Sequence, residues 1–522
     1  MNEGNEVEKA VLPSGVDHSV QARTAGRNAS GIDVLAGFLR ERSGALLCIL
    51  AFLVVVVIPF RIHLYQFAAQ DDARRHVAKV ISGRDWSDIV VLDKPFTNFD
   101  HNQGWHVILG CVHRLGLDKA EMLQFSAIGL FLVFALAGLC ICHREPDAWM
   151  VAMLASALLT PCPRWMQGRP YILAAAVFLA LLHLWREPRD NQLTRALVST
   201  FLFAFATWTH GSWYLFALMP LGLFCCGRIR EAALNTACWL GGSFLGACLT
   251  GRPFSFLLDH LIQAKAVLHS SPVTRLLVPE FQPALQSLAA ILVLPLLVWK
   301  HQRGEDMWKT HGRNPAFWLM IIGWILGFSN GRFWMDWGSV AFMAWVASTL
   351  APDLRQLGSS RPFRRVLLSG LLAVGVYLSW TVDSESRWSN NEYTDPLNQD
   401  DPAHQGWLPE PGGIIYSDDM LVFYLTFYQN PNAPWRYILG YEAGLMPPDD
   451  LRTLREIQFY QGNLASAYKP WVDKFTSADR LVLLRNPSDQ PQVPGLEWKY
   501  VAYKTWVGRL PRAGTPVTPA PR

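Results

Sequence analysis

A polar stretch shortly after the first long apolar run contains residues that could carry out chemistry. Residues 70–79 read Gln-Asp-Asp-Ala-Arg-Arg-His-Val-Ala-Lys, which places Asp71 and Asp72 side by side at the head of a predicted helix. A carboxylate there can act as a general base, and a pair of carboxylates permits a divalent cation such as Mg²⁺ or Mn²⁺. Asp72 and His76 are four residues apart and would share one helix face. The alternative is a plain helix cap on an interfacial amphipathic helix.

A second polar cluster follows at residues 100–106, which read Asp-His-Asn-Gln-Gly-Trp-His. Its spacing matches no standard zinc pattern. His101 and His106 are therefore predicted to contact a sugar or a phosphate rather than a structural metal. The alternative is a polar turn ahead of the apolar stretch 107–112.

Further ionisable residues lie close to the ends of apolar runs. Each alone would be an interfacial anchor or a helix cap. Gathered at one membrane face, they would form a basic, aromatic-lined pocket for an anionic phosphate head whose lipid tail stays in the bilayer. The candidate substrate-binding residues are His76, His101, His106, Arg164, Arg169, His210, Lys265 and Arg332.

The elements that must position these residues are membrane-spanning helices. Of the 522 residues, 51% are hydrophobic and only 17% are charged, and the 22 Trp suit a chain with rings at membrane interfaces. A net charge of +4 is too small to suggest a nucleic-acid partner. We count about eleven spans, several of them shorter than the usual ~20 residues and so tilted or re-entrant. The runs are 44–60, 122–142, 148–161, 169–185, 196–208, 212–227, 232–250, 284–299, 316–328, 337–351 and 366–380.

The charges of the loops predict which side each loop occupies. With a cytoplasmic N-terminus, the short even-numbered loops carry fourteen Lys and Arg, and the short loops on the other side carry six. Positive charge concentrates in cytoplasmic loops. This bias places the first long loop, 61–121, and the C-terminal tail on the exported side.

Three regions are predicted along the chain. Residues 1–43 are polar and read as a cytoplasmic, disordered lead-in. Residues 44–380 form the multi-span domain, which includes the first exported loop. Residues 381–522 alternate short strands with helices, which predicts a small exported α/β domain with a disordered, Pro-rich end. We expect strands at 413–417, 435–439, 480–484 and 498–507 and helices at 418–428 and 449–460.

This layout resembles the GT-C superfamily of integral-membrane glycosyltransferases. The shared features are many spans, a long first exported loop with an acidic pair near its start, and a soluble exported C-terminal domain. Asp71 and Asp72 stand where that superfamily carries its catalytic aspartate. The resemblance covers the layout of the whole chain and identifies no subfamily.

The resemblance implies a specific reaction. A polyprenyl-phosphate-linked sugar would be the donor, and a lipid, glycan or protein the acceptor. One Asp would deprotonate the acceptor hydroxyl, and the sugar would transfer with inversion on the periplasmic face of a bacterial inner membrane. Basic residues would bind the donor phosphate. No cofactor is required, although the Asp pair permits a divalent cation. Only one of Asp71 and Asp72 would point into the pocket, since neighbours on a helix are about 100° apart around its axis. We take Asp71 as the base, which leaves Asp72 to cap the helix or orient His76.

Two other functions remain open from the sequence. A transporter or flippase of a lipid-linked or anionic substrate would place ionisable residues near the bilayer midplane, often in repeated halves. The spans here carry few central charges, and no internal repeat is visible. A non-catalytic envelope assembly protein would tolerate replacement of both Asp71 and Asp72.

Overall fold

A computed structural model describes residues 31–69, 72–93, 100–188, 191–268, 282, 288–389, 397–459 and 465–511. Asp71, most of the predicted lead-in and the Pro-rich C-terminal end lie outside these residues. The first helix, α1 (Gly31–His63), begins well before the first apolar run. Residues 31–43, which we assigned to a disordered lead-in, are therefore helical, and that boundary was wrong.

Each of the eleven apolar runs overlaps a described helix. Three helical stretches are long and apolar enough to cross a membrane: Arg42–His63, Lys119–Ile141 and Pro362–Thr381. A fourth candidate, Ile229–Cys248 with Pro253–Lys265, bends by 111° at its break. The helices of the bundle are α1, α5 (Lys119–Gln124) continuing through η2 (Phe125–Gly129) into α6 (Leu130–Ile141), α7 (Pro146–Leu159), α9 (Tyr171–Leu184), α10 (Gln192–Thr209), η3 (Trp213–Ala217) with α11 (Leu218–Cys225), α12 (Ile229–Cys248), α13 (Pro253–Leu268), α15 (Ala289–Gln302), α16 (Pro315–Gly327), η7 (Phe333–Gly338) with α17 (Ser339–Ser360), and α18 (Pro362–Thr381).

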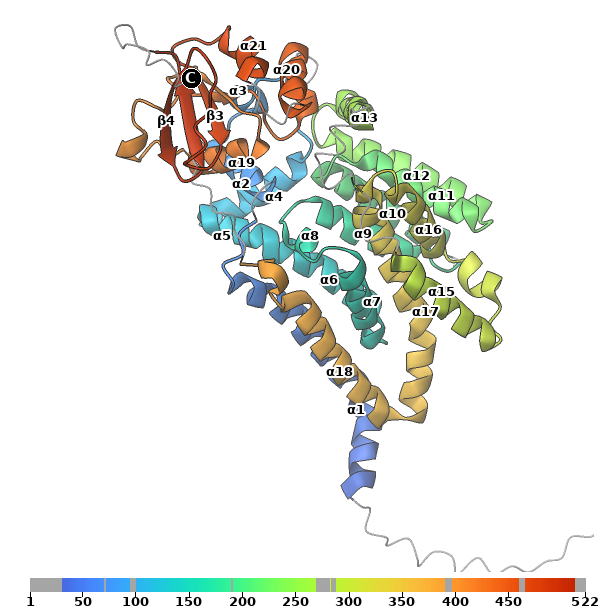
Figure 1. The fold of residues 1–522 in the computed structure, drawn as a ribbon. Coiled ribbons are helices and arrows are strands. Elements are labelled where there is room, and N and C mark those ends of the chain that lie inside the picture. The colour runs from blue at the N-terminus through green and yellow to red at the C-terminus, as the bar shows by residue number, and fades with distance from the viewer. Residues whose placement is uncertain are drawn as a thin grey trace, which may run out of the picture.

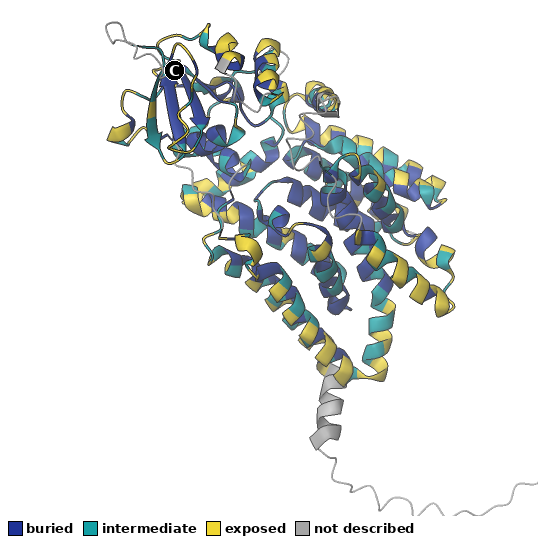
Figure 2. Ribbon diagram, in the orientation of Figure 1, coloured by how far each residue is buried: buried dark blue, intermediate teal, exposed yellow. Residues whose placement is uncertain are grey.

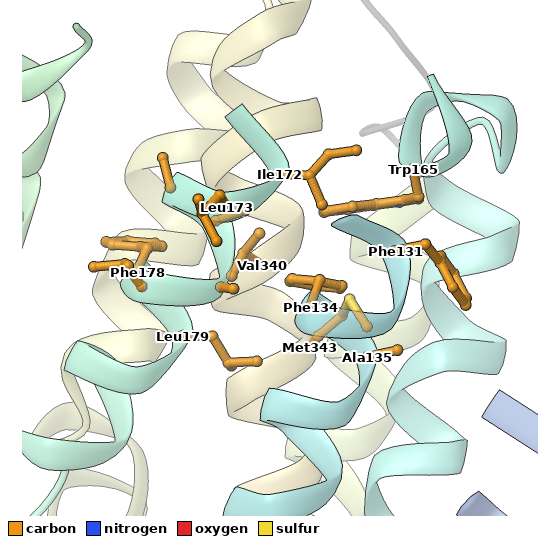
Figure 3. Close-up of a cluster of buried hydrophobic side chains, with 14 of the residues drawn as sticks. Phe131, Phe134, Ala135, Trp165, Ile172, Leu173, Phe178, Leu179, Val340 and Met343 are labelled. Atoms are coloured by element: carbon orange, nitrogen blue, oxygen red, sulfur yellow. The ribbon is translucent and has the colours of Figure 1, made fainter. Parts of the chain in front are cut away.

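The helical bundle has an aromatic core and an apolar outer surface. Phe134 of α6 stacks on Trp165 of the short α8 (Pro163–Met166), with ring centroids 4.4 Å apart, and Phe178 of α9 packs nearby with Val340 and Met343 of α17 (Figure 3). Large apolar side chains are exposed along the outer faces of α1 and α18, which lie side by side (Figures 1 and 2). Such a surface suits lipid contact.

The first loop folds into the helices α2 (Asp72–Ser82), α3 (Trp86–Ile89) and α4 (Gln103–Arg114). α2 and α3 dock on the C-terminal domain, whereas α4 packs on α2 and on α10 of the bundle. Val91 N donates to Tyr437 O at 2.9 Å, and Asp93 N donates to Leu445 O at 2.8 Å. Trp86 and Val90 share an apolar core with side chains of the C-terminal domain. The loop and the domain therefore form one unit, which sits at one end of the bundle (Figure 1).

The C-terminal domain is a small α/β fold, as the sequence predicts. Its five-stranded sheet has the order β2-β1-β3-β5-β4, in which β1 (Ile414–Tyr416) pairs parallel with both β2 (Arg436–Tyr437) and β3 (Arg480–Leu484). The helices α19 (Met420–Gln429), α20 (Pro448–Phe459) and α21 (Lys469–Val472) connect these strands. Parallel strands need such crossover connections.

One predicted strand of this domain was wrong. Residues 498–507 form a hairpin rather than a single strand, with β4 (Glu497–Ala502) antiparallel to β5 (Thr505–Arg509). Lys504 takes a φ of 59° at the turn. The turn contains no Gly, Asn or Pro, so the sequence carries none of the usual hairpin signals.

Candidate functional site

Asp72 lies at the start of α2 among guanidinium groups from three parts of the chain. Arg75 Nε donates to Asp72 Oδ1 at 2.7 Å, and Arg169 Nε lies 3.6 Å from Asp72 Oδ2. Arg332 is near enough for its charge to lower the pKa of Asp72. We call Asp72, Arg75, Arg169 and Arg332 the Asp72 cluster. Arg169 precedes α9 and Arg332 precedes η7, so two membrane helices and the first loop meet at this point.

The C-terminal domain completes the surroundings of the Asp72 cluster. The Tyr424 hydroxyl on α19 donates to Asp72 Oδ1 at 3.4 Å. The Tyr441 ring lies under the Arg75 guanidinium, with 4.3 Å between Cζ and the ring centroid. The ring of Trp86, on α3, has its centroid 5.8 Å from the Arg75 Cζ. Arg75 is therefore held by a carboxylate and two aromatic rings, which fixes its direction.

Positive charge surrounds the Asp72 carboxylate. Among the described residues, the guanidinium groups of Arg75, Arg169 and Arg332 all lie close enough to act on it. Burial alone would raise the pKa of Asp72, but Arg75, Arg169 and Arg332 together hold that pKa well below its usual range. Asp72 is therefore ionised at neutral pH.

A chain of hydrogen bonds joins the two polar clusters of the first loop. His106 Nδ1 lies 2.9 Å from Asp100 Oδ2, and His106 Nε2 lies 2.8 Å from His76 Nδ1. The Asn102 backbone N–H also donates to Asp100, at 3.0 Å. Burial would raise the pKa of Asp100, but His106 and this N–H hold it well below its usual range. Asp100 is therefore an ionised acceptor at the end of this series of hydrogen bonds.

A group of imidazoles lies beside the Asp72 cluster. The rings of His101 and His260 meet edge to face with centroids 5.0 Å apart. Gly211 N donates to His101 O at 2.8 Å, and a Cβ at Gly211 would meet the His260 ring at 1.8 Å. Only glycine allows this close approach. His210, which ends α10, feels the charges of Asp72, Arg75 and Arg332, and its burial lowers its pKa to about 3.

Arg164 is engaged in a different way from the other predicted arginines. Its Nε and Nη2 both donate to Asp336, at 2.8–2.9 Å, and its guanidinium lies 4.6 Å from the Tyr171 ring centroid. Both side chains of the ion pair are largely buried. This geometry ties the α8 segment to η7 and leaves Arg164 neutralised, so we assign it a structural role.

Replacing Arg164 by Met is therefore expected to destabilise the protein by about 3 kcal/mol, because it leaves the Asp336 carboxylate buried and unpaired. Thermal unfolding in detergent measures this loss. The double variant Arg164→Met/Asp336→Asn should recover part of it. An unchanged melting temperature together with lost donor binding would instead support the predicted substrate-binding role of Arg164.

The buried imidazoles make stability sensitive to acid. Burial, together with the charge of Arg75, holds the pKa of His76 well below its ordinary value, and the pKa of His210 is lowered as well. The unfolded chain therefore takes up protons first as the pH falls through about 6.5. This stability is fully present above that pH and decreases below it, by about 1–2 kcal/mol for each histidine between pH 6.5 and 5. Melting temperatures at pH 7.5 and 5 should differ less in His76→Gln than in the wild type. An equal difference would contradict this account.

The structure brings together most of the predicted site residues. His76, His101, His106, Arg169, His210 and Arg332 surround Asp72 or join the imidazoles next to it. Lys265 is exposed on α13, one turn beyond His260. Asp71, the favoured base, lies outside the described residues. Among described residues, no group of three or more His, Cys, Asp or Glu is placed to hold a metal ion.

Sequence reasoning did not select Arg75, Tyr424 and Tyr441. Arg75 stands three residues after Asp72, and this spacing on a helix would have indicated the ion pair. The two tyrosines lie more than 300 residues further along the chain. No local pattern indicates that they reach the first loop.

The chain resembles a solved structure in its fold, but no sequence match was found. No protein-family model matches the chain, and no curated protein matches it in sequence. The crystal structure of ArnT from Cupriavidus metallidurans in the apo state aligns with 91% of this chain and 98% of its own, at 15% identity and a TM-score of 0.49. At this identity and TM-score the activity has to be argued from the residues of this chain.

Proposed function

We propose that the protein is a GT-C-type glycosyltransferase that moves a sugar from a polyprenyl-phosphate donor to an acceptor. One observation supports this above all. Three guanidinium groups, those of Arg75, Arg169 and Arg332, gather around Asp72 where membrane helices, the first loop and the C-terminal domain meet. Guanidinium groups bind phosphate in a forked geometry.

The position of the arginines suits a lipid-linked donor. Arg169 and Arg332 each stand at the start of an apolar helix of the bundle. A phosphate bound there leaves its polyprenyl tail in the bilayer beside those helices. The sugar then faces the unit formed by the first loop and the C-terminal domain, which would contact the acceptor.

The chemistry requires the anomeric C–O bond to the phosphate to break while a bond to the acceptor oxygen forms, with inversion at that carbon. Negative charge grows on the departing phosphate. Arg169 and Arg332 stabilise this charge in a site that excludes much of the water, where electrostatic interactions are strong. Polyprenyl phosphate is the second product.

The role of Asp72 in this proposal is to position the arginines. Both of its carboxylate oxygens are engaged: Oδ1 accepts from Arg75 and Tyr424, and Oδ2 faces Arg169. An aspartate base would therefore be Asp71. A divalent cation next to Asp72 is disfavoured, because guanidinium groups already occupy its carboxylate oxygens.

The orientation follows from the loop charges. We propose a multi-pass protein of a bacterial inner membrane, surrounded by membrane lipids, with the N-terminus cytoplasmic and the Asp72 cluster periplasmic. The acceptor is a lipid, a glycan or a protein reached from that side, and no nucleic acid takes part.

The test is release of polyprenyl phosphate by reconstituted protein from a panel of lipid-linked sugars, with acceptor mixtures and with or without a chelator. We expect turnover in the wild type, loss of turnover in Asp71→Asn/Asp72→Asn with folding retained, and no effect of the chelator. Equal turnover in the variant would move the catalytic site elsewhere. Absence of turnover in the wild type with every donor would contradict the proposal.

A further inference from the structure

His76 has a hydrogen-bonding arrangement that the proposed function does not yet use. Its side chain is fully buried on α2, one helical turn after Asp72. Its Nδ1 pairs with His106 Nε2 at 2.8 Å, whereas its Nε2 has no hydrogen-bond partner among the described residues. A buried polar atom without a partner costs about 1–3 kcal/mol, so its presence calls for an explanation.

The direction of these hydrogen bonds follows from Asp100, the last acceptor in the series His76–His106–Asp100. Asp100 is ionised and can only accept, so His106 Nδ1 carries the proton that it donates to Asp100. With a single ring proton on His106, its Nε2 accepts the hydrogen bond from His76 Nδ1, and His76 Nε2 carries a lone pair; this is the tautomer that the proposal below requires.

We propose that His76 Nε2 is the proton acceptor for the nucleophile, positioned through His106 by Asp100, and that the nucleophile is a neutral hydroxyl group. This inference rests on the proposed transferase function. It also narrows the acceptor, because a phosphate oxyanion carries no proton to remove and would have no use for such a base.

The proposed step couples transfer of the sugar to transfer of one proton. The acceptor oxygen attacks the anomeric carbon, and its proton moves to His76 Nε2, directly or through one water molecule. The anomeric C–O bond to the phosphate breaks, and its electron pair leaves on the phosphate. His76 becomes an imidazolium that donates from Nδ1 to His106, which in turn donates to the Asp100 carboxylate. The proton afterwards passes to water.

The charges around His76 are suited to this role. Burial, Arg75, His106 and His210 disfavour its imidazolium, and Asp100 favours it. His76 is therefore unprotonated at neutral pH and ready to accept. Asp100 stabilises the positive charge only as that charge forms, which is the interaction that accelerates a reaction.

The tautomer of His76 can be measured without any turnover. We would record ¹⁵N NMR spectra of protein labelled at its histidine rings and assign His76 by the signal lost in His76→Gln. At pH 7.5 we expect a neutral ring protonated at Nδ1. A ring protonated at Nε2, or at both nitrogens, would overturn the proposal whatever the activity.

Kinetics test the role itself. In His76→Gln, transfer to hydroxyl acceptors should fall roughly 10²–10⁴-fold. Transfer to azide, an anion that needs no base, should stay within a few-fold of wild type. In Asp100→Asn, the acid limb of the kcat profile should move to lower pH, because the imidazolium loses a nearby negative charge. A merely structural role of Asp100 would lower activity without moving this limb.

The outcomes separate the two proposals. Turnover in the wild type and an equal rate in His76→Gln with a hydroxyl acceptor would overturn the role of His76 and leave the transferase function standing. Loss in Asp71→Asn without loss in His76→Gln would assign the base to Asp71. Phosphate-bearing acceptors used in preference to hydroxyl acceptors would overturn the proposed acceptor class. No turnover by the wild type with any donor would overturn the transferase function and this inference with it.

Discussion

Replacing Arg169 by Ala is expected to lower kcat for polyprenyl-phosphate release roughly 10²–10³-fold. This is the usual cost of removing one group that stabilises charge growing in the transition state. Arg169 lies beside the Asp72 carboxylate at the start of α9, with 13% of its side chain exposed, and is placed to meet a phosphate at the membrane boundary. Initial rates with a lipid-linked donor measure the effect.

The matched variant for this prediction is Arg169→Lys. It keeps the charge but loses the planar fork, so we expect a smaller loss than with Ala. Both variants should melt within a few degrees of the wild type. Equal activity of wild type and Arg169→Ala would show that Arg169 does not stabilise the leaving group.

Replacing Asp72 by Asn is expected to have two opposite effects. Turnover should fall roughly 10²-fold, because Arg75 and Arg169 lose the carboxylate that positions them, and small misplacements in an active site have costs of that size. Affinity for free polyprenyl phosphate should rise roughly tenfold, or about 1.4 kcal/mol, because the anion no longer competes with a carboxylate. Direct binding and initial rates measure the two quantities.

The control for this prediction is Asp306→Asn, which removes an exposed carboxylate from a loop predicted to lie on the cytoplasmic side. It should change neither quantity. Weaker binding of polyprenyl phosphate to Asp72→Asn would contradict the account, since it would mean that Asp72 contacts the ligand through a bound cation or a hydroxyl group.

Local patterns in the sequence were enough to locate much of the site. The sequence predicts that Asp71 and Asp72 stand at the head of a helix, and α2 begins at Asp72. The i,i+4 spacing put His76 on the face of Asp72, and the excess of charge at the ends of apolar runs selected Arg169 and Arg332. These inferences depend only on neighbours in the chain, where helix geometry decides which residues meet.

Long-range contacts could not be predicted in this way. The pairing of Arg164 with Asp336 joins residues 172 positions apart. From the sequence alone, Arg164 was a candidate ligand for the phosphate. The arrival of Tyr424 and Tyr441 at α2 depends on how the first loop packs on the C-terminal sheet through Trp86 and Val90. That packing is set by the shape of two surfaces, which neither composition nor periodicity records.

The His76–His106 contact lies between these two cases. Both polar clusters of the first loop were visible in the sequence, but the distance between them depends on how α2 packs on α4. The 2.8 Å hydrogen bond turns two separate candidate sites into one. For His106, the predicted contact with a sugar or a phosphate therefore gives way in the present proposal to a role in proton transfer.

The most direct test of the central claim is the stoichiometry of the two products in one reaction. Reconstituted protein would receive a donor labelled in its sugar, and polyprenyl phosphate and labelled acceptor would be counted together over time. We predict that both appear in a one-to-one ratio in the wild type and that both disappear in Arg169→Ala. Movement of intact donor across the membrane without formation of either product would contradict the transferase account and favour a transporter.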